Sequence, residues 1–425
     1  MKGNLALGNA LWLIFGRLAQ AGISLLVGIL TARYLGPSDY GLIHYAAGIT
    51  GFFGAFCTLG LPSILVRELV DRKQQEGTLL GTALTMRCLS SLCAVMMMLF
   101  LKRGQMEAMG WILGWSCTAM ALRTFDSFHL VFQARQRCRI TAVVLLISHS
   151  AAMAYRAALL ILGKSAAWFA FGAVLEGLCA AVLLVCAYRR EGGQLLGFSR
   201  EMARRLWDKS RHFILPGLMV AVYAQTDKVM LTNMLGQEAT GCYSAAVSLC
   251  NGWCFVLSAI IEAMTPEIVG AYRRCGAEFR QKNRQLYALI FWLSAGMAVA
   301  FFCLGGPLVG FIYGDAYLPA VAPLKILGWY TAFSYLGVAR NPWVVCREVQ
   351  KRLVWVYAAA AGANVVLNCL LIPRWGSSGA AAASLAAQVL SAVVVPAFIP
   401  ALGENSRLML EGILLKKLGN REEKP

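Results

Sequence analysis

Polar and charged side chains interrupt several stretches of this sequence that are otherwise apolar and long enough to cross a membrane. A charge at the centre of a bilayer costs about 2.5 kcal/mol or more, so such residues usually face a polar interior or a partner. Arginine stays charged and grips phosphate oxygens with its forked guanidinium group. We therefore expect a polar cavity that binds an anionic, phosphate-bearing substrate. Its candidate binding residues are Arg17, Gln20, Arg87, Arg156, Tyr223, Asn251, Arg340 and Asn364.

Acidic side chains in the same stretches suggest a second chemistry. Asp227 lies four residues after Tyr223, so the two share one face of a helix. Asp227 and Glu262 are candidates for a group that carries a coupling proton or sodium ion, or for counter-charges to arginine. The alternative is structural pairing, which is open for Arg123 with Asp126, for Asp227 with Lys228, and for the other arginines with Glu176 or Glu262.

The cysteines and histidines do not form a recognisable metal or catalytic centre. Most of the 14 cysteines lie within apolar stretches, and no CxxC pair or Cys/His cluster of metal spacing occurs. Cys250 and Cys254 share a helical face, but two thiols make an incomplete zinc site. The sequence also lacks a Ser/His/Asp arrangement and the GxxxxGK[ST] phosphate-binding loop. We therefore predict no catalytic residue, no metal, no cofactor and no enzymatic activity.

The composition indicates an all-α integral membrane protein. The chain is 59% hydrophobic and 14% charged, with a mean hydropathy of +0.62, whereas soluble domains are about 25% charged. Hydropathy predicts about twelve transmembrane helices. Their ranges are 8–31, 40–61, 79–101, 108–131, 140–162, 166–187, 212–234, 241–262, 286–307, 321–344, 353–373 and 378–401.

Basic residues concentrate on one side of these predicted spans. With the N-terminus inside, 27 of the 39 lysines and arginines fall on the cytoplasmic side and 5 on the other. This asymmetry follows the positive-inside rule, so we expect both termini in the cytoplasm of a multi-pass protein. The net charge of +18 is then explained by topology and by contact with anionic membrane lipids, without a nucleic-acid partner.

The two halves of the chain resemble each other. Leu35-Gly36 and Gly41 recur as Leu235-Gly236 and Gly241 at one constant offset. Because each half holds an even number of spans, the repeat is parallel, and two pseudo-symmetric six-helix bundles are expected. The predicted parts are an N-terminal bundle (1–187), a cytoplasmic amphipathic linker (188–211), a C-terminal bundle (212–401) and a cytoplasmic tail (402–425).

The linker carries its own helical signal. Phe198, Met202 and Leu206 recur every four residues, with basic residues around them. This pattern is typical of a helix that lies in the membrane interface.

Four runs of the sequence resemble the oligosaccharide flippases of the polysaccharide transporter group, within the multidrug/oligosaccharidyl-lipid/polysaccharide superfamily. The first run is residues 9–69, from NALWLIFGRL to SILVREL. The second is HFILPGLMVAVYAQTDKVMLTNMLGQEATGCYSAA, with its mid-helix Asp227. The others are LVGFIYGDAYLPA and NVVLNCLLIPRWGSSGAAAAS.

The resemblance implies a fold and a function. It implies a V-shaped pair of bundles that works by alternating access in a bacterial plasma (inner) membrane. The substrate would be an undecaprenyl-pyrophosphate-linked glycan, with a polysaccharide polymerase and glycosyltransferases as further partners. Arg17 and Arg340 would hold the pyrophosphate, and Gln20, Tyr223, Asn251 and Asn364 would contact sugars.

Two other functions compete with this interpretation. A cation-coupled multidrug or small-molecule exporter of the same superfamily should have an anionic or aromatic cavity, whereas these spans hold more Arg and Lys than Asp and Glu. A membrane-embedded glycan polymerase or ligase typically needs a large outer loop with catalytic residues, and the longest predicted outer loop is only about residues 305–320.

Overall fold

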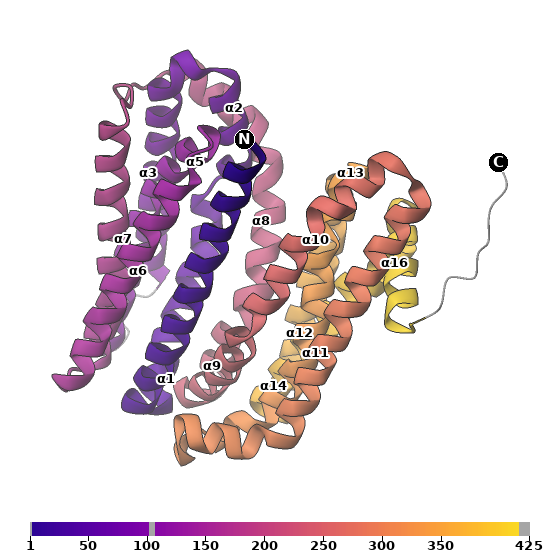
Figure 1. The fold of residues 1–425 in the computed structure, drawn as a ribbon. Coiled ribbons are helices and arrows are strands. Elements are labelled where there is room, and N and C mark those ends of the chain that lie inside the picture. Colours follow the sequence, from indigo (N-terminus) through magenta and orange to yellow (C-terminus); the bar gives the residue numbers. More distant parts are fainter. Residues whose placement is uncertain (1, 102–106, 416–425) are drawn as a thin grey trace. The chain divides into compact units, whose positions relative to one another are not determined.

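Helices make up almost the whole chain (Figure 1). The computed structural model describes the backbone of residues 2–101 and 107–415, and their side chains except those of residues 2–19, 21, 63, 99, 101, 107 and 108. No strand occurs within these ranges. The all-α fold class predicted from the composition is therefore confirmed.

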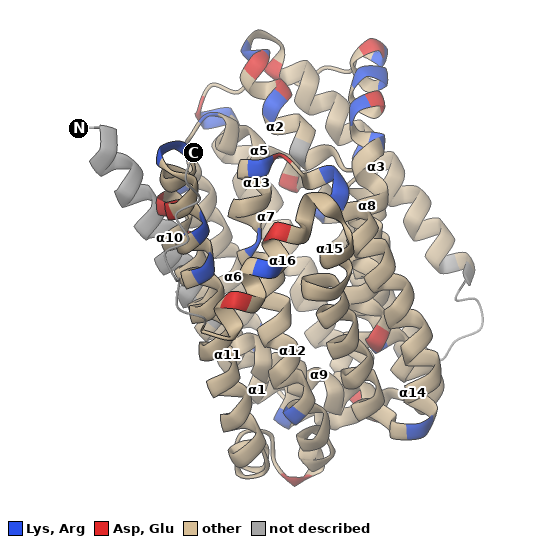
Figure 2. Ribbon diagram, turned by 90° about the vertical axis from the view of Figure 1, so that its right-hand side faces the viewer, with Lys and Arg blue, Asp and Glu red and all other residues tan. Residues whose placement is uncertain are grey.

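Six helical stretches among the described residues are long and apolar enough to cross a membrane. They are Lys73–Met98, Cys138–Ile161, Ala166–Arg190, Gln237–Arg274, Gly276–Tyr313 and Gln350–Phe398. The last contains two of the predicted spans, 353–373 and 378–401, so the six stretches correspond to seven of the twelve. The other five spans stay a prediction. Charged residues lie mostly near the ends of the helices and leave long uncharged middles (Figure 2).

The chain packs as two compact units, of which the first contains the described residues up to Ala245 together with Ile312–Tyr317. Its central helix is α1 (Lys2–Cys57). Two short helices, α2 (Leu61–Asp71) and α5 (Ser127–Ala134), contact each other at one end of the unit. The helices that pack against α1 are α3 (Glu76–Leu101), α4 (Glu107–Leu122), α6 (Cys138–Ile161), α7 (Ala166–Arg190) and α8 (Arg200–Leu235).

The second unit contains Ala246–Phe311 and the described residues from Leu318 onward. The boundary between the units falls within α9 (Gln237–Gly252). A π-helical segment, η5 (Leu390–Val394), joins α14 to α15, and the core of the unit forms around Leu336, Trp343 and Met409. Its helices are α10 (Cys254–Arg274), α11 (Gly276–Tyr313), α12 (Val321–Ala339), α13 (Asn341–Arg347), α14 (Leu353–Val389), α15 (Val395–Phe398) and α16 (Pro400–Ile413).

Single glycines divide the long apolar helices α1 and α14. Gly36 (φ 75°, ψ 171°) interrupts α1, and Gly376 (φ 58°, ψ −137°) interrupts α14. A side chain would be strained at these φ values, so glycine suits both turns. Pro37 opens the second half of α1, a position where its missing N–H leaves no helical bond unmade. The helix α1 is therefore a hairpin of two helical segments, which correspond to the predicted spans 8–31 and 40–61 (Figure 1).

The glycines of the sequence repeat meet in the first unit. A Cβ atom added to Gly41 would lie 1.9 Å from the carbonyl oxygen of Gln237, and one added to Gly241 would lie 1.8 Å from that of Pro37. Only glycine permits backbones to approach so closely. The start of α9 therefore packs directly on the second half of α1, and Gly236 (φ 93°) precedes α9 as Gly36 precedes that half.

The segment before α8 differs from the prediction. Ser199 caps this helix, because its Oγ accepts a hydrogen bond from the Met202 amide at 3.3 Å. Met202 and Leu206 are buried in the core of the first unit, where α2 and α3 cover them, and Phe198 is exposed. Two of the three residues of the predicted apolar stripe therefore pack against protein, and an interfacial helix over 188–211 stays a prediction.

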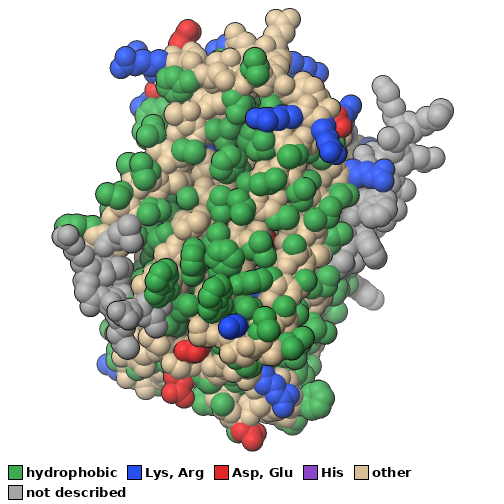
Figure 3. All heavy atoms as spheres, turned by 90° about the vertical axis from the view of Figure 1, so that its left-hand side faces the viewer, with side chains coloured by type: hydrophobic (Ala, Val, Ile, Leu, Met, Phe, Trp, Pro, Cys, Tyr) green, Lys and Arg blue, Asp and Glu red, His purple; other side chains and the backbone are tan. Residues whose placement is uncertain are grey.

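Large apolar side chains cover the outer surface of the helices. Figure 3 shows one face with hydrophobic side chains across its middle and charged side chains mostly toward its two ends. Contiguous apolar surface of this kind suits lipid tails rather than water. The chain is therefore a multi-pass membrane protein, as the composition predicts. Exposed residues of the first unit include Leu89, Leu92, Met96, Trp111, Ile161, Trp168 and Val182.

Candidate functional site

Arg87, a predicted binding residue, lies buried on α3 with 6% of its surface exposed. Its Nη1 donates a hydrogen bond to Ser127 Oγ at 2.8 Å, and its Nη2 donates to the carbonyl oxygen of Arg123 at 3.0 Å. That carbonyl belongs to a 3₁₀ turn, η2 (Arg123–Asp126), which breaks the predicted span 108–131 between α4 and α5. A change of helix type leaves carbonyl groups in need of new donors. Arg87 supplies one.

Arg340 has a parallel position in the second unit. It is 1% exposed, and its Nη1 donates to the carbonyl oxygen of Ser391 at 3.1 Å. Ser391 lies in the π-helical segment η5, whose wider turn also changes the backbone pairing. Arg87, on α3, and Arg340, between α12 and α13, thus both donate to the carbonyl oxygen of an irregular helical segment. A role for them in binding a substrate stays a prediction.

The other predicted residues occupy different environments. Gln20 on α1 and Tyr223 on α8 are half-buried, whereas Asn251 on α9 and Glu262 on α10 are exposed. Arg17 lies outside the described side chains. Asn364 is buried on α14, where its Nδ2 donates to Ser384 Oγ at 3.3 Å and its Oδ1 accepts from Asn368 at 3.2 Å.

Asp227 is a buried acid of α8 with a defined donor. Its exposed fraction is 6%, and its Oδ2 accepts a hydrogen bond from the Tyr243 hydroxyl at 2.7 Å. It also interacts electrostatically with Lys228, the neighbour that the sequence offered as a structural partner. The Tyr243 hydroxyl and the Lys228 ammonium group thus both suit an Asp227 carboxylate that serves as a counter-charge to Lys228.

A chain of polar groups crosses three helices of the first unit. Ser24 Oγ on α1 lies 2.7 Å from Nε2 of His149 on α6. The opposite ring nitrogen of His149, Nδ1, lies 3.0 Å from Oε1 of Glu176 on α7. Arg156, two turns along α6 from His149, interacts electrostatically with Glu176. Arg156 also packs against Gly172 of α7, where an added Cβ would lie 2.8 Å from its Nε.

Cationic groups meet beside this chain. His44, on the second half of α1, interacts electrostatically with Lys228 of α8 and with Arg156 of α6. The ring of Tyr40 lies edge-on against that of His44, with centroids 4.4 Å apart. Two cations from different helices thus act on one histidine of α1. Such an arrangement can bind an anion, while His149 and Glu176 can hold a proton.

Sequence reasoning missed the roles of His149, His44 and Lys228. His149 and Arg156 are seven residues apart and lie on one helical face, and Glu176 is the sole acid of the predicted span 166–187. These were the available signals, but the partners come from three different helices. The alternative that Glu176 pairs with an arginine across helices agrees with its interaction with Arg156.

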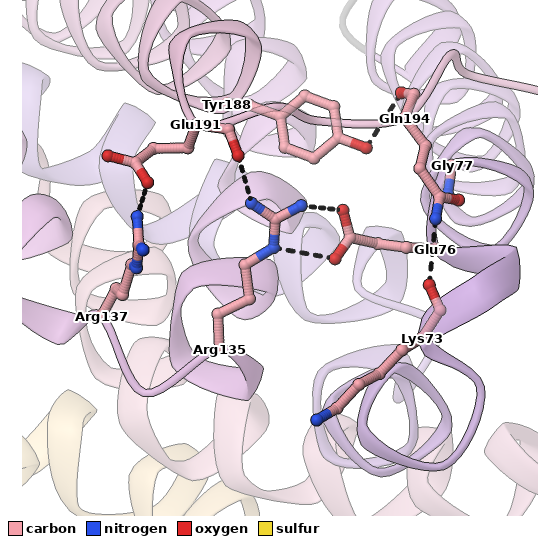
Figure 4. Close-up of polar contacts among 8 residues, drawn as sticks. All are labelled: Lys73, Glu76, Gly77, Arg135, Arg137, Tyr188, Glu191 and Gln194. Carbon is pink, nitrogen blue, oxygen red and sulfur yellow. Dashed lines mark hydrogen bonds and ion pairs between the residues drawn. The ribbon is translucent and has the colours of Figure 1, made fainter.

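A second polar cluster fastens the end of the first unit at which α7 ends (Figure 4). The guanidinium group of Arg135 binds both carboxylate oxygens of Glu76, at 2.9 and 2.5 Å, and donates to the carbonyl oxygen of Glu191 at 3.1 Å. Gln194 bridges the loops, because its Oε1 accepts from the Gly77 amide at 3.0 Å and its Nε2 donates to the Lys73 carbonyl at 3.0 Å. Together with the Arg137–Glu191 ion pair, these contacts hold the linker onto α3.

One further acid anchors α8 to α2. Glu68 is 2% exposed and receives a hydrogen bond from Lys209 and an ion pair from Arg205, whose Nε lies 3.3 Å away. Burial alone would raise the pKa of Glu68, but the Lys209 hydrogen bond and the charges of Arg205, Lys209 and Arg72 outweigh it and hold that pKa below 4.5. Within the described ranges, no group of three His, Cys, Asp or Glu side chains is placed to hold a metal ion.

Comparison with protein families gives one match that covers more than half of the chain. A family described as polysaccharide biosynthesis protein matches residues 6–270. Among curated proteins, an uncharacterized membrane protein of Methanocaldococcus jannaschii is 21% identical over 191 residues, which cover 43% of this chain and 37% of that protein. The chain therefore matches little more than a third of this relative's length.

Solved structures show the same fold. A lipid II flippase MurJ, in an inward closed conformation, has a TM-score of 0.72 at 11% identity, over 96% of this chain and 93% of that chain. An inward-facing multidrug resistance MATE family transporter of the MOP superfamily has a TM-score of 0.66 at 13% identity, over 92% and 95%. The MATE multidrug transporter DinF-BH, in complex with a ligand, has 0.63 at 14%, over 97% of each. The resemblance of the four sequence runs to a polysaccharide family is confirmed by the family match, and the solved structures show the same fold.

Proposed function

We propose that this chain, which belongs to the polysaccharide biosynthesis protein family, flips a polyprenyl-pyrophosphate-linked oligosaccharide repeat unit across the plasma membrane of a bacterium by alternating access. The product would serve the export of a cell-surface polysaccharide. The observation that carries the proposal is the family match over residues 6–270. The fold shared with a lipid II flippase, whose substrate is also lipid-linked, supports it.

The chemistry of the first unit suits such a substrate. A pyrophosphate is a multivalent anion, and Arg156 and Lys228 bring two cations to His44 at membrane depth. We add Arg156 and Lys228 to Arg17 and Arg340, the predicted pyrophosphate ligands. The sugars would contact Gln20, Tyr223, Asn251 and Asn364, while the polyprenyl tail stays in lipid. The partners would be a polysaccharide polymerase and glycosyltransferases, which consume and supply the lipid-linked glycan.

A second candidate is a cation-coupled exporter of drugs or other small molecules. The observation that favours it is the fold shared with MATE multidrug transporters, one of which was solved in complex with a ligand. Asp227 and Glu262 would then be the first carboxylates to test for coupling. The family match favours the flippase.

Deletion of the gene in its own host separates the two candidates. A flippase requires that surface polysaccharide be lost and that polyprenyl-pyrophosphate-linked repeat units accumulate, while sensitivity to drugs is unchanged. Re-expression of the wild-type chain should restore the polymer, and Arg156→Ala should restore less than a tenth of it at equal protein level. Normal surface polysaccharide together with raised drug sensitivity would reject the flippase in favour of the exporter.

A further inference from the structure

We propose that His149 and Glu176 hold one exchangeable proton inside the first unit, and that this proton couples transport to a pH gradient. The coupling part rests on the proposed transport function, whereas the proton site can be tested without a substrate. The site differs from Asp227 and Glu262, which the sequence suggested. Its geometry is the chain Ser24–His149–Glu176 across α1, α6 and α7.

The serine hydroxyl allows the imidazole to change its protonation state without a change of partners. When His149 is neutral, its Nδ1–H donates to Glu176 Oε1 at 3.0 Å, and Nε2 accepts the Ser24 hydroxyl proton at 2.7 Å. When a proton is added at Nε2, the new N–H donates to Ser24 Oγ, and the hydroxyl rotates to accept it. A hydroxyl both donates and accepts, so both states are satisfied by the same three heavy atoms.

The surrounding charges place the proton on the imidazole rather than on the carboxylate. His149 and Arg156 of α6 and Arg123 of η2 act electrostatically on Glu176. From α1, the near group is the neutral hydroxyl of Ser24. A carboxylate 3.0 Å from Nδ1 is placed to stabilise an imidazolium at His149.

The Ser24 hydroxyl supplies a path for proton exchange at Nε2. It lies 2.7 Å from Nε2 and is half-buried, so it can pass its own proton to the ring and take up another in its place. Glu176 stays bonded to Nδ1 during this exchange and does not carry the proton.

A proton fits this site better than a metal ion. Sodium prefers several oxygen ligands, while the chain offers one hydroxyl, one carboxylate and an imidazole nitrogen. Within the described residues, no third acidic, histidine or cysteine side chain joins the pair in a metal-binding group.

The proton also changes the contacts between helices. Protonation converts the hydrogen bond between α6 and α7, in which a neutral imidazole donates to a carboxylate, into an ion pair. It also reverses the donor between α6 and α1, the central helix of the unit. The pair is therefore placed to alter how strongly α1 is held.

Nuclear magnetic resonance of ¹³C/¹⁵N-histidine in the full-length protein in lipid nanodiscs tests the proton site. The chain has 4 histidines, so single His→Gln variants assign each signal. The His149 signal should respond to pH, and Glu176→Gln should weaken proton binding at His149 about tenfold or more, because it removes the carboxylate beside Nδ1. Glu201→Gln, which removes an exposed acid of α8, is the matched control and should change proton binding less than twofold. A His149 signal that does not respond to pH, or equal changes in both variants, would overturn the site.

Surface polysaccharide in the host tests the coupling. His149→Gln and Glu176→Gln should each lower it about tenfold at equal protein level, while His129→Gln, on the neighbouring α5, should leave it unchanged. A titrating His149 with normal polymer in both variants would overturn the coupling. If deletion of the whole gene leaves the polymer intact, the proposed function fails, and the resonance experiment still decides whether the proton site exists.

Discussion

Replacing Gly241 by alanine should loosen the first unit. A Cβ at this position would lie 1.8 Å from the carbonyl oxygen of Pro37 and 2.7 Å from its carbonyl carbon. Real Cβ atoms essentially never come within 3.0 Å of another heavy atom, so the start of α9 must move away from α1 by more than 1 Å. Both obstructing atoms belong to the backbone, so a side-chain rotation cannot relieve the clash.

The cost can be bounded from overpacking in other proteins. Insertion of a methyl group into a close-packed contact costs about 1–3 kcal/mol. We expect the upper end here, because displacement of the backbone would also strain neighbouring contacts, such as the 3.1 Å hydrogen bond from the Tyr45 hydroxyl to Asn233 Oδ1. Gly41→Ala should cost a similar amount. The double variant should cost less than the sum of the two, because a contact that has opened once need not open again.

Thermal unfolding of the detergent-solubilised protein, followed by tryptophan fluorescence, measures these changes. Gly28→Ala is the control, since nothing lies within 4 Å of its added Cβ and alanine favours a helix over glycine by about 1 kcal/mol. Gly241→Ala and Gly41→Ala should melt several degrees below wild type, and Gly28→Ala at or above it. If Gly241→Ala melts with Gly28→Ala, the glycine contact does not hold these helices together.

Three further predictions concern the polar clusters. Arg87→Ala should lower the free energy of unfolding by about 2–3 kcal/mol, because Ser127 and the Arg123 carbonyl lose a hydrogen-bond donor. In the same melting assay, Arg87→Lys should recover only part of the lost stability. Glu68 should stabilise the protein above pH 4.5 and lose that effect as the pH falls through its lowered pKa, because protonation removes its ion pairs. Glu68→Gln should therefore melt lower than wild type at pH 7, and the difference should disappear as the pH falls below that pKa; a difference that is constant with pH would refute this. Arg135→Lys should speed hydrogen exchange of the amides in residues 191–199 at least tenfold, because lysine cannot bind Glu76 and the Glu191 carbonyl at once. Exchange at the wild-type rate would contradict the role of the Arg135 guanidinium group in holding this segment.

The fold was largely predictable because its signals are local. Apolar runs of spanning length located the helices, and the constant offset between Gly36 and Gly236 marked two positions with the same left-handed φ. The helix breaks were harder to foresee. The predicted span 108–131 contains no glycine turn at its break, and the 3₁₀ turn at Arg123–Asp126 is stabilised by Arg87 from another helix.

The polar site was predictable in kind but not in its pairings. The sequence predicted charged residues inside the helical bundles, and Arg340 is such a residue. Its partner is the carbonyl of a π-helical segment, which no pattern in the sequence predicts. His149 stood alone in the sequence because its partners, Ser24 and Glu176, lie on other helices. An apolar stripe such as that of Met202 and Leu206 does not reveal whether lipid or protein covers it.

The turn at Gly36 bears on how the chain enters the membrane. One non-helical residue separates the two helical segments of α1, so little polar chain has to cross the bilayer between them. Their backbone hydrogen bonds are made almost entirely within each segment, as insertion into lipid requires. The two segments can therefore leave the translocon as a preformed pair rather than as successive spans. Gly376 likewise separates the two segments of α14 by one non-helical residue, so these segments can also enter the membrane as a pair. An insertion of polar residues at Gly36 or Gly376 should therefore disturb the membrane integration of both neighbouring segments together.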